Sequence, residues 1–148
     1  MSGETHPPPM QIVDVSLELK APIDTAWRLL SDHESWTRWA GFGRVVRERD
    51  GAPEQNGVGA IRRMPGGGRE EVVRYGPGFT LGYRVISGLP LRDHLGEVDF
   101  APLGPDRFQA RWRCRFDSTI PGAGPLMRVG VTWIFRRMLR RLERAASK

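Results

Sequence analysis

Four polar side chains in the middle of this 148-residue chain have types that suit acid–base or polarising chemistry: His94, Tyr83, Arg62 and Glu71. An imidazole titrates near pH 7 and therefore suits a general acid or base. A tyrosine hydroxyl and a guanidinium can hold and polarise a carbonyl oxygen. His94 is therefore the candidate catalytic residue, with Tyr83 and Arg62 as partners, for aldol cyclisation or dehydration. The alternative interpretation is a structural or solvated histidine near a strand end.

Arg62 and Glu71 stand on either side of Gly66-Gly67, and a hairpin centred there places them opposite each other on one face. The residues that share this face are the more apolar set, so we expect the pair to point inward. Burying an ion costs several kcal/mol unless it is paired or hydrated. Two interpretations remain open: a partly exposed salt bridge without function, or polar groups that orient a ligand in a water-containing cavity.

The sequence offers no pattern for a metal ion or a nucleotide. Three scattered histidines and the single Cys114 form no ligand cluster, so we expect no metal site and no cofactor. The run Gly66-Gly67-Gly68 precedes no helix and is predicted to be a hairpin turn, not a phosphate loop. Cys114 lies on an apolar strand face and is predicted to be buried and unreactive.

The formal net charge of +6 comes almost entirely from arginine, since Lys20 and Lys148 are the only lysines. This charge gives weak support to nucleic acid or an anionic membrane as a partner. The first ten residues lack the basic and apolar regions of a secretory signal, and no stretch has the length of a membrane span. We therefore expect a cytoplasmic protein with a disordered tail at 1–9 and one domain at 10–148.

Strands must position most of the candidate groups. Residues 11–19 alternate apolar and polar side chains, which is typical of a strand with one buried face. Turn sequences separate six further predicted strands, at about 44–49, 57–64, 69–75, 80–87, 92–102 and 107–118. These segments predict an antiparallel sheet of about seven strands, which must curl. Two short helices are predicted between the first strand and the others, and the second carries Trp36 and Trp39.

The last segment, residues 125–146, is the longest one-sided pattern in the chain. At helical spacing its apolar residues form one stripe: Met127, Val131, Ile134, Phe135, Met138, Leu142 and Ala145. The opposite side carries Arg136, Arg137, Arg140 and Arg144. The pattern predicts a long helix that lies in the concavity of the curved sheet, in an α+β fold.

Several motifs resemble a known family. The pattern A-P-x-x-x-A-W-x-x-L-x-D-x-x-x-W-x-x-W at 21–39, the segments at 57–62, 69–72 and 83–85, Trp112 with Phe116, and Pro121-Gly122 occur in the family's order. The chain thus resembles the polyketide cyclase/dehydrase and lipid-transport family (SRPBCC) of the START and Bet v 1-like superfamily, over roughly residues 10–146. The resemblance implies a helix-grip fold with a deep cavity between helix and sheet that accepts apolar or aromatic molecules.

By position, the resemblance implies a set of ligand-binding residues but no universal catalytic residue. The cavity wall would include Arg62, Glu71, Tyr83, His94 and Trp112, with Trp36, Trp39 and Phe42 near the entrance and Ile134 and Met138 on the long helix.

Three functions compete at this stage. The leading hypothesis is a binder of an apolar or aromatic small molecule such as a lipid, polyketide or quinone-like compound. The first alternative is a polyketide-type cyclase or dehydratase that uses His94. The second is an electrostatic binder of anionic membrane or nucleic acid through the arginine-rich helix face, although that face lacks the interleaved aromatic residues typical of nucleic-acid binding. Trp133 lies at the edge of the apolar helix stripe, where we expect it to line an opening or an interface. Trp133 and an exposed edge strand keep a homodimer among the alternatives.

Overall fold

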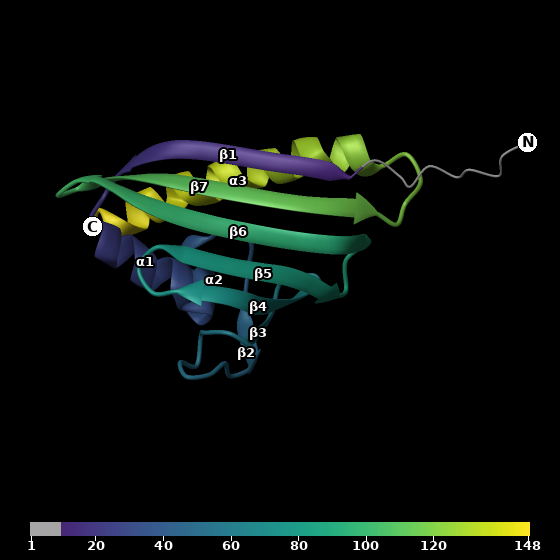
Figure 1. The fold of residues 1–148 in the computed structure, drawn as a ribbon, viewed down its shortest axis with the longest axis horizontal. Helices are drawn as coiled ribbons and strands as arrows, with labels where there is room; N and C mark the ends of the chain where they lie inside the picture. The colour runs from purple at the N-terminus through teal and green to yellow at the C-terminus, as the bar shows by residue number, and fades with distance from the viewer. Residues whose placement is uncertain (1–9) are drawn as a thin grey trace, which may run out of the picture.

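The computed structural model describes residues 10–148, so the tail predicted at 1–9 lies outside the described residues. Its seven strands form one antiparallel sheet in the order β1-β7-β6-β5-β4-β3-β2 (Figure 1). The strands are β1 (Gln11–Lys20), β2 (Val46–Arg49), β3 (Ile61–Arg63), β4 (Arg69–Gly76), β5 (Thr80–Ser87), β6 (Leu91–Gly104) and β7 (Arg107–Ser118). The chain therefore places its first two strands at opposite edges of the sheet.

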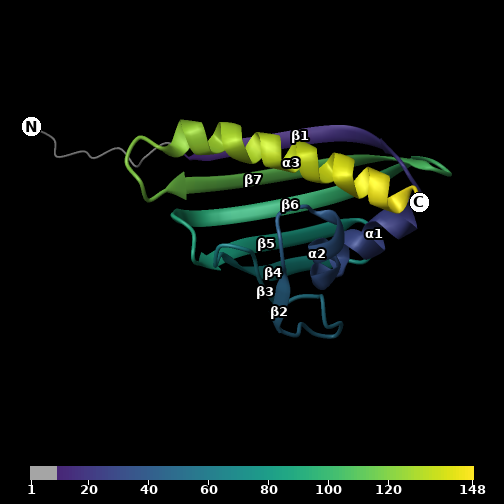
Figure 2. The same cartoon turned by 180° about the vertical axis from the view of Figure 1, so that it is seen from behind.

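The helices all lie on one side of the curved sheet (Figure 2). They are α1 (Ile23–Ser31), the short 3-10 helix η1 (His33–Ser35), α2 (Trp36–Trp39) and α3 (Gly124–Ala146). The long helix α3 packs against β1 and β7, and α1 contacts α3. The α+β helix-grip architecture predicted from the sequence is confirmed.

The core fills the space between α3 and the concave face of the sheet. Strand β7 shows the pattern most clearly, because its apolar residues are buried and its arginines point to the outer face. From the helix, Leu139 and Leu142 are fully buried against this face. Cys114 is buried as predicted, and burial raises the pKa of its thiol to about 12.

The strand at 57–64 is shorter than predicted. Strand β3 comprises only Ile61–Arg63. The residues before it form turns, in which the Gly57 N–H donates to the Glu54 carbonyl and the Ala60 N–H donates to the Gly57 carbonyl. Gly59 has a φ of 91°, a backbone conformation that glycine adopts readily and a strand does not use.

The predicted pairing of Arg62 with Glu71 is wrong by one residue. In the β3–β4 hairpin Arg62 lies opposite Glu70, and Ile61 lies opposite Glu71. The connection occupies residues 64–68, closed by a hydrogen bond from the Met64 N–H to the Gly68 carbonyl. Because successive strand residues point to opposite faces, this one-residue difference moves Glu71 to the outer face. There its carboxylate bonds the guanidinium groups of Arg49 and Arg84.

Helix α3 is long, but its arginines make it too polar to cross a membrane, and no other helix within residues 10–148 has the length and apolarity to do so. The predicted cytoplasmic location stays a prediction.

Candidate ligand-binding site

A pocket of about 560 Å³ lies between the concave face of the sheet, α2 with the loop that follows it, and the middle of α3. Seven of the ten predicted ligand-binding residues line it: Trp36, Phe42, Arg62, Tyr83, Trp112, Ile134 and Met138. Glu70, Leu89, Trp133 and Arg137 also line it, although we predicted none of them as ligand-binding. Trp133, which we placed at an opening or interface, is largely exposed at the mouth.

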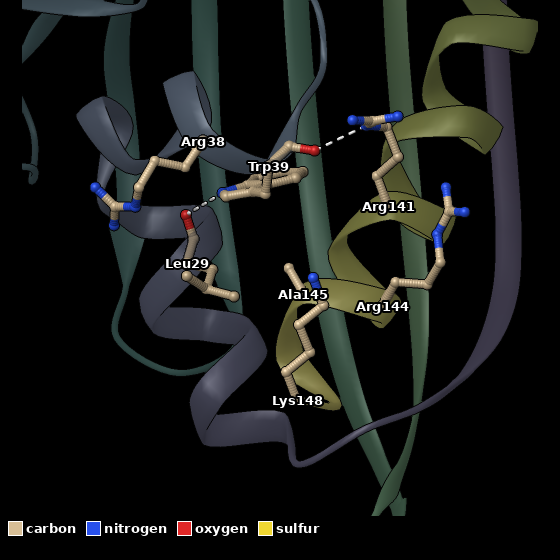
Figure 3. A pocket seen from close by; sticks show the side chains of 7 residues that line it. All are labelled: Leu29, Arg38, Trp39, Arg141, Arg144, Ala145 and Lys148. Carbon is tan, nitrogen blue, oxygen red and sulfur yellow. Dashed lines mark hydrogen bonds between the residues drawn. The ribbon is translucent and has the colours of Figure 1, made fainter.

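The other three predicted residues lie elsewhere. Glu71 is on the outer face, for the reason given above. Trp39 lines a second pocket, of about 470 Å³, between α1, α2 and the C-terminal end of α3 (Figure 3). His94 lies beside Tyr83, with 5.4 Å between the ring centroids, but is not part of the pocket wall.

Arg62 is the most deeply buried charged residue at the pocket, with 1% of its surface exposed. Its Nε and Nη2 both lie 2.8 Å from Oε1 of Glu70. The guanidinium is enclosed by two aromatic rings, 4.2 Å from the centroid of Trp36 and 4.8 Å from that of Tyr83. Ion pairing and cation–π contacts together compensate for the loss of water around the charge.

His33 completes this buried cluster, and sequence reasoning assigned it no role. Its Nδ1 lies 3.1 Å from Nη1 of Arg62, and its Nε2 lies 3.2 Å from the carbonyl oxygen of Asn56. A guanidinium can only donate, so Nδ1 must accept, and Nε2 carries the proton that is donated to Asn56. One feature of the sequence indicates this position. His33 precedes Trp36 by three residues, which puts both side chains on one side of a helical turn.

The surroundings of His33 keep its ring neutral. Burial, followed by the nearby charge of Arg62, lowers the pKa of His33 from 6.5 to about 3. The imidazole therefore acts as a fixed acceptor behind Arg62 and not as a proton carrier near neutral pH.

Tyr83 presents a hydroxyl group at the same end of the pocket. Its oxygen accepts a 2.8 Å hydrogen bond from Nε1 of Trp112, and no residue within 10–148 accepts the tyrosine's own proton. Burial raises the pKa of Tyr83 well above its usual value, so the proton is retained. The ring lies against Gly96 on β6, where a Cβ would overlap it. Tyr83 is therefore held as a hydrogen-bond donor.

Arg62 also has donors to spare for a ligand. A guanidinium carries five N–H groups; Nε and Nη1 are hydrogen-bonded to Glu70 and His33, and Nη2 is ion-paired with Glu70. Arg62, Glu70 and Tyr83 line one end of the pocket and make it the polar end of a cavity with mainly aromatic and aliphatic walls.

His94 completes the hydrogen bonding of the sheet. Regular pairing between β5 and β6 runs only from Thr80↔Asp99 to Tyr83↔Gly96, and β6 is irregular between Arg92 and Leu95. Beyond that point the Val85 N–H donates to Nδ1 of His94 at 3.0 Å. Burial lowers the pKa of His94, which favours the neutral ring that this bond needs.

We expect His94→Ala to lower the free energy of unfolding by about 1–2 kcal/mol, because the Val85 N–H loses its acceptor. Urea denaturation measures this loss, and hydrogen exchange of the Val85 amide should accelerate by about tenfold. An alanine variant with unchanged stability and unchanged exchange at Val85 would contradict the structural role.

The second pocket is basic. Figure 3 shows Arg38, Arg141, Arg144 and Lys148 around an apolar floor formed by Leu29, Trp39 and Ala145. Nε of Arg141 donates to the carbonyl oxygen of Trp39 at 2.8 Å. Among the described residues, no carboxylate pairs with the side chains of Arg38, Arg144 or Lys148.

One family model matches almost the whole described chain. Residues 10–147 match the family model described as polyketide cyclase/dehydrase and lipid transport. A comparison with curated protein sequences found no match.

Several solved structures share the fold at low sequence identity. A START superfamily protein from Mycobacterium smegmatis has a TM-score of 0.79 and 15% identity, over 92% of this chain and 97% of the other. The Zhui aromatase/cyclase from Streptomyces sp. R1128 has a TM-score of 0.72 and 16% identity, over 93% and 94% of the two chains. Norcoclaurine synthase from Thalictrum flavum, in complex with dopamine and hydroxybenzaldehyde, has a TM-score of 0.68 and 14% identity, over 93% and 87%. At such identities the likeness supports the fold alone.

Proposed function

This chain belongs to the polyketide cyclase/dehydrase and lipid-transport family, and on that premise we propose that it binds an apolar or aromatic small molecule in the pocket between α3 and the sheet. The observation that carries the proposal is the pocket itself, whose aromatic walls surround unused hydrogen-bond donors of Arg62 and Tyr83. Its volume of about 560 Å³ is in the range of small-molecule sites.

The donors at the polar end define the ligand's chemistry further. In this proposal Arg62 and Tyr83 donate to the ligand, which would therefore carry an acceptor such as a carbonyl or phenolate oxygen. Trp36 and Trp112 on the wall favour a flat ring system, which aromatic side chains hold by stacking or edge contacts. The proposed ligand is thus an aromatic molecule with one oxygen directed at Arg62 and Tyr83.

We assign no reaction to the pocket. His94 uses Nδ1 to accept the Val85 N–H and lies outside the wall, while His33 is fixed between Arg62 and Asn56. Neither imidazole is free to exchange a proton with a molecule in the pocket. Binding is therefore the function that the side chains support best.

A matched pair of probes tests the proposal: 2-acetylnaphthalene, which has a carbonyl, and 2-isopropenylnaphthalene, which replaces that oxygen with a carbon. We expect the carbonyl compound to bind about fivefold to tenfold more tightly, the effect of one hydrogen bond. Tyr83→Phe should reduce this preference while keeping the ring against Arg62. Quenching of tryptophan fluorescence measures the binding.

A blocking variant shows where the probes bind. Ile134 lies partly exposed at the pocket wall, so Ile134→Trp fills the mouth without disturbing the core. Ile12→Trp is the matched control, because Ile12 is exposed on the outer face of β1. We expect only Ile134→Trp to abolish binding of both probes. Equal affinity in the two variants would refute the site.

A further inference from the structure

One face of α3 points to solvent and carries apolar residues along its N-terminal half. Leu126, Val129 and Trp133 are 77%, 62% and 62% exposed, and at helical spacing they fall on one side, away from the sheet. An exposed apolar patch rimmed by polar residues is one mark of a protein or membrane contact surface.

The same face becomes basic in its C-terminal half. Arg136, Arg137, Arg140 and Arg144 are exposed there. Of these four arginines, only Arg140 has a carboxylate partner within residues 10–148, namely Glu143 at 3.1 Å. Arg137 lies over the Trp133 ring, 5.3 Å from its centroid, at the junction of the two halves. The uncompensated charge calls for an anionic partner.

We propose that this solvent face of α3, with its apolar half (Leu126, Val129, Trp133) and its basic half (Arg136, Arg137, Arg140, Arg144), docks onto an anionic lipid membrane. The apolar half would enter the headgroup region, while the arginines would contact lipid phosphates. Tryptophan prefers the membrane–water interface, and Trp133 stands where the two halves meet. Phosphate-rich nucleic acid would leave the apolar half without a partner.

The face adjoins the pocket mouth. Trp133 and Arg137 line the pocket, and across the mouth the exposed side chains of Phe42 and Leu89 add further apolar surface. In Figure 2 α3 lies in front of β1 and β7, and no helix or strand is drawn over it. Docking does not depend on the function proposed above, because the side chains that carry it differ from those at the polar end.

Vesicle flotation tests the proposal, with phosphatidylcholine vesicles compared with vesicles that contain one quarter phosphatidylglycerol. We expect the protein to float only with the anionic vesicles and to detach as the salt concentration rises. Arg136→Gln/Arg144→Gln should weaken binding about thirtyfold, since each basic residue near the surface contributes on the order of 1 kcal/mol. Leu126→Ser/Val129→Ser should weaken it about tenfold or more.

Arg74→Gln/Arg115→Gln is the matched control. Both residues are exposed on the outer face of the sheet without an ion pair, and the variant loses the same net charge. We expect it to bind vesicles within about twofold of wild type if the α3 face is the contact. An equal loss in the control, or full binding by the serine variant, would overturn the proposal.

A second copy of the chain is the competing occupant of the face. A concentration-dependent dimer that Leu126→Ser/Val129→Ser converts to a monomer, combined with no flotation of the wild type, would assign the face to self-association and overturn membrane docking. A wild-type monomer that floats with anionic vesicles supports it. Light scattering after size-exclusion chromatography distinguishes the two.

Discussion

Arg62→Met is expected to lower the free energy of unfolding by about 3–5 kcal/mol, a loss that urea denaturation measures directly. Methionine retains an apolar stem between Trp36 and Tyr83 but removes the charge. The carboxylate of Glu70, whose side chain is 12% exposed, would then be left without its cation. Nδ1 of His33 would also lose its donor. Removing one member of a buried ion pair is costly, because the charge of the other member remains where water solvates it poorly.

Arg84→Met is the control for this substitution. Arg84 pairs with Glu71 at the outer face and is 57% exposed, so its loss should change stability by about 0–1 kcal/mol. The double variant Arg62→Met/Glu70→Leu should recover about 2 kcal/mol relative to Arg62→Met, since it removes the orphaned carboxylate. Equal losses of unfolding free energy for Arg62→Met and Arg84→Met would contradict the stabilising role of the buried cluster.

His33 should make the protein less stable as the pH falls from 6.5 toward 3. Above pH 6.5 the imidazole is neutral in both folded and unfolded chains, and its full contribution is present. Below pH 6.5 the unfolded chain binds a proton, whereas the folded chain does not until its pKa of about 3. The free energy of unfolding therefore falls by up to about 1.4 kcal/mol per pH unit, or about 2–3 kcal/mol between pH 6.5 and 4.5.

His33→Gln tests this dependence, because glutamine does not titrate but can still accept from Arg62 and donate to Asn56. Urea denaturation at pH 6.5, 5.5 and 4.5 should give a flatter profile for the variant than for wild type. Asp14 and Glu71 have lowered carboxyl pKa values, so they also reduce stability as the pH falls, but both residues are present in the two proteins. His94 is present in both proteins, so the difference isolates His33. Identical profiles would mean that His33 is not buried in its neutral form.

The sequence alone determined most of the elements and the buried faces of the longest ones. In β7 the alternation of apolar residues with arginines predicts that Trp112 points inward and Arg113 outward, and both do. In α3 the spacing of Phe135, Met138 and Leu142 predicts the stripe that packs on the sheet. These predictions succeed because the direction of a side chain within a strand or helix follows from local backbone geometry.

Only the tertiary structure decided the partners at the polar end of the pocket. The register of the β3–β4 hairpin depends on a five-residue turn, and a change of one residue exchanges Glu70 for Glu71 beside Arg62. His33 reaches Arg62 from 29 residues away, through a bend between α1 and α2 whose direction no periodicity encodes. Such contacts depend on how separate elements pack together. Local sequence patterns therefore determined most of the strands and helices of this protein, while the packing of distant segments determined which charged residues meet inside it.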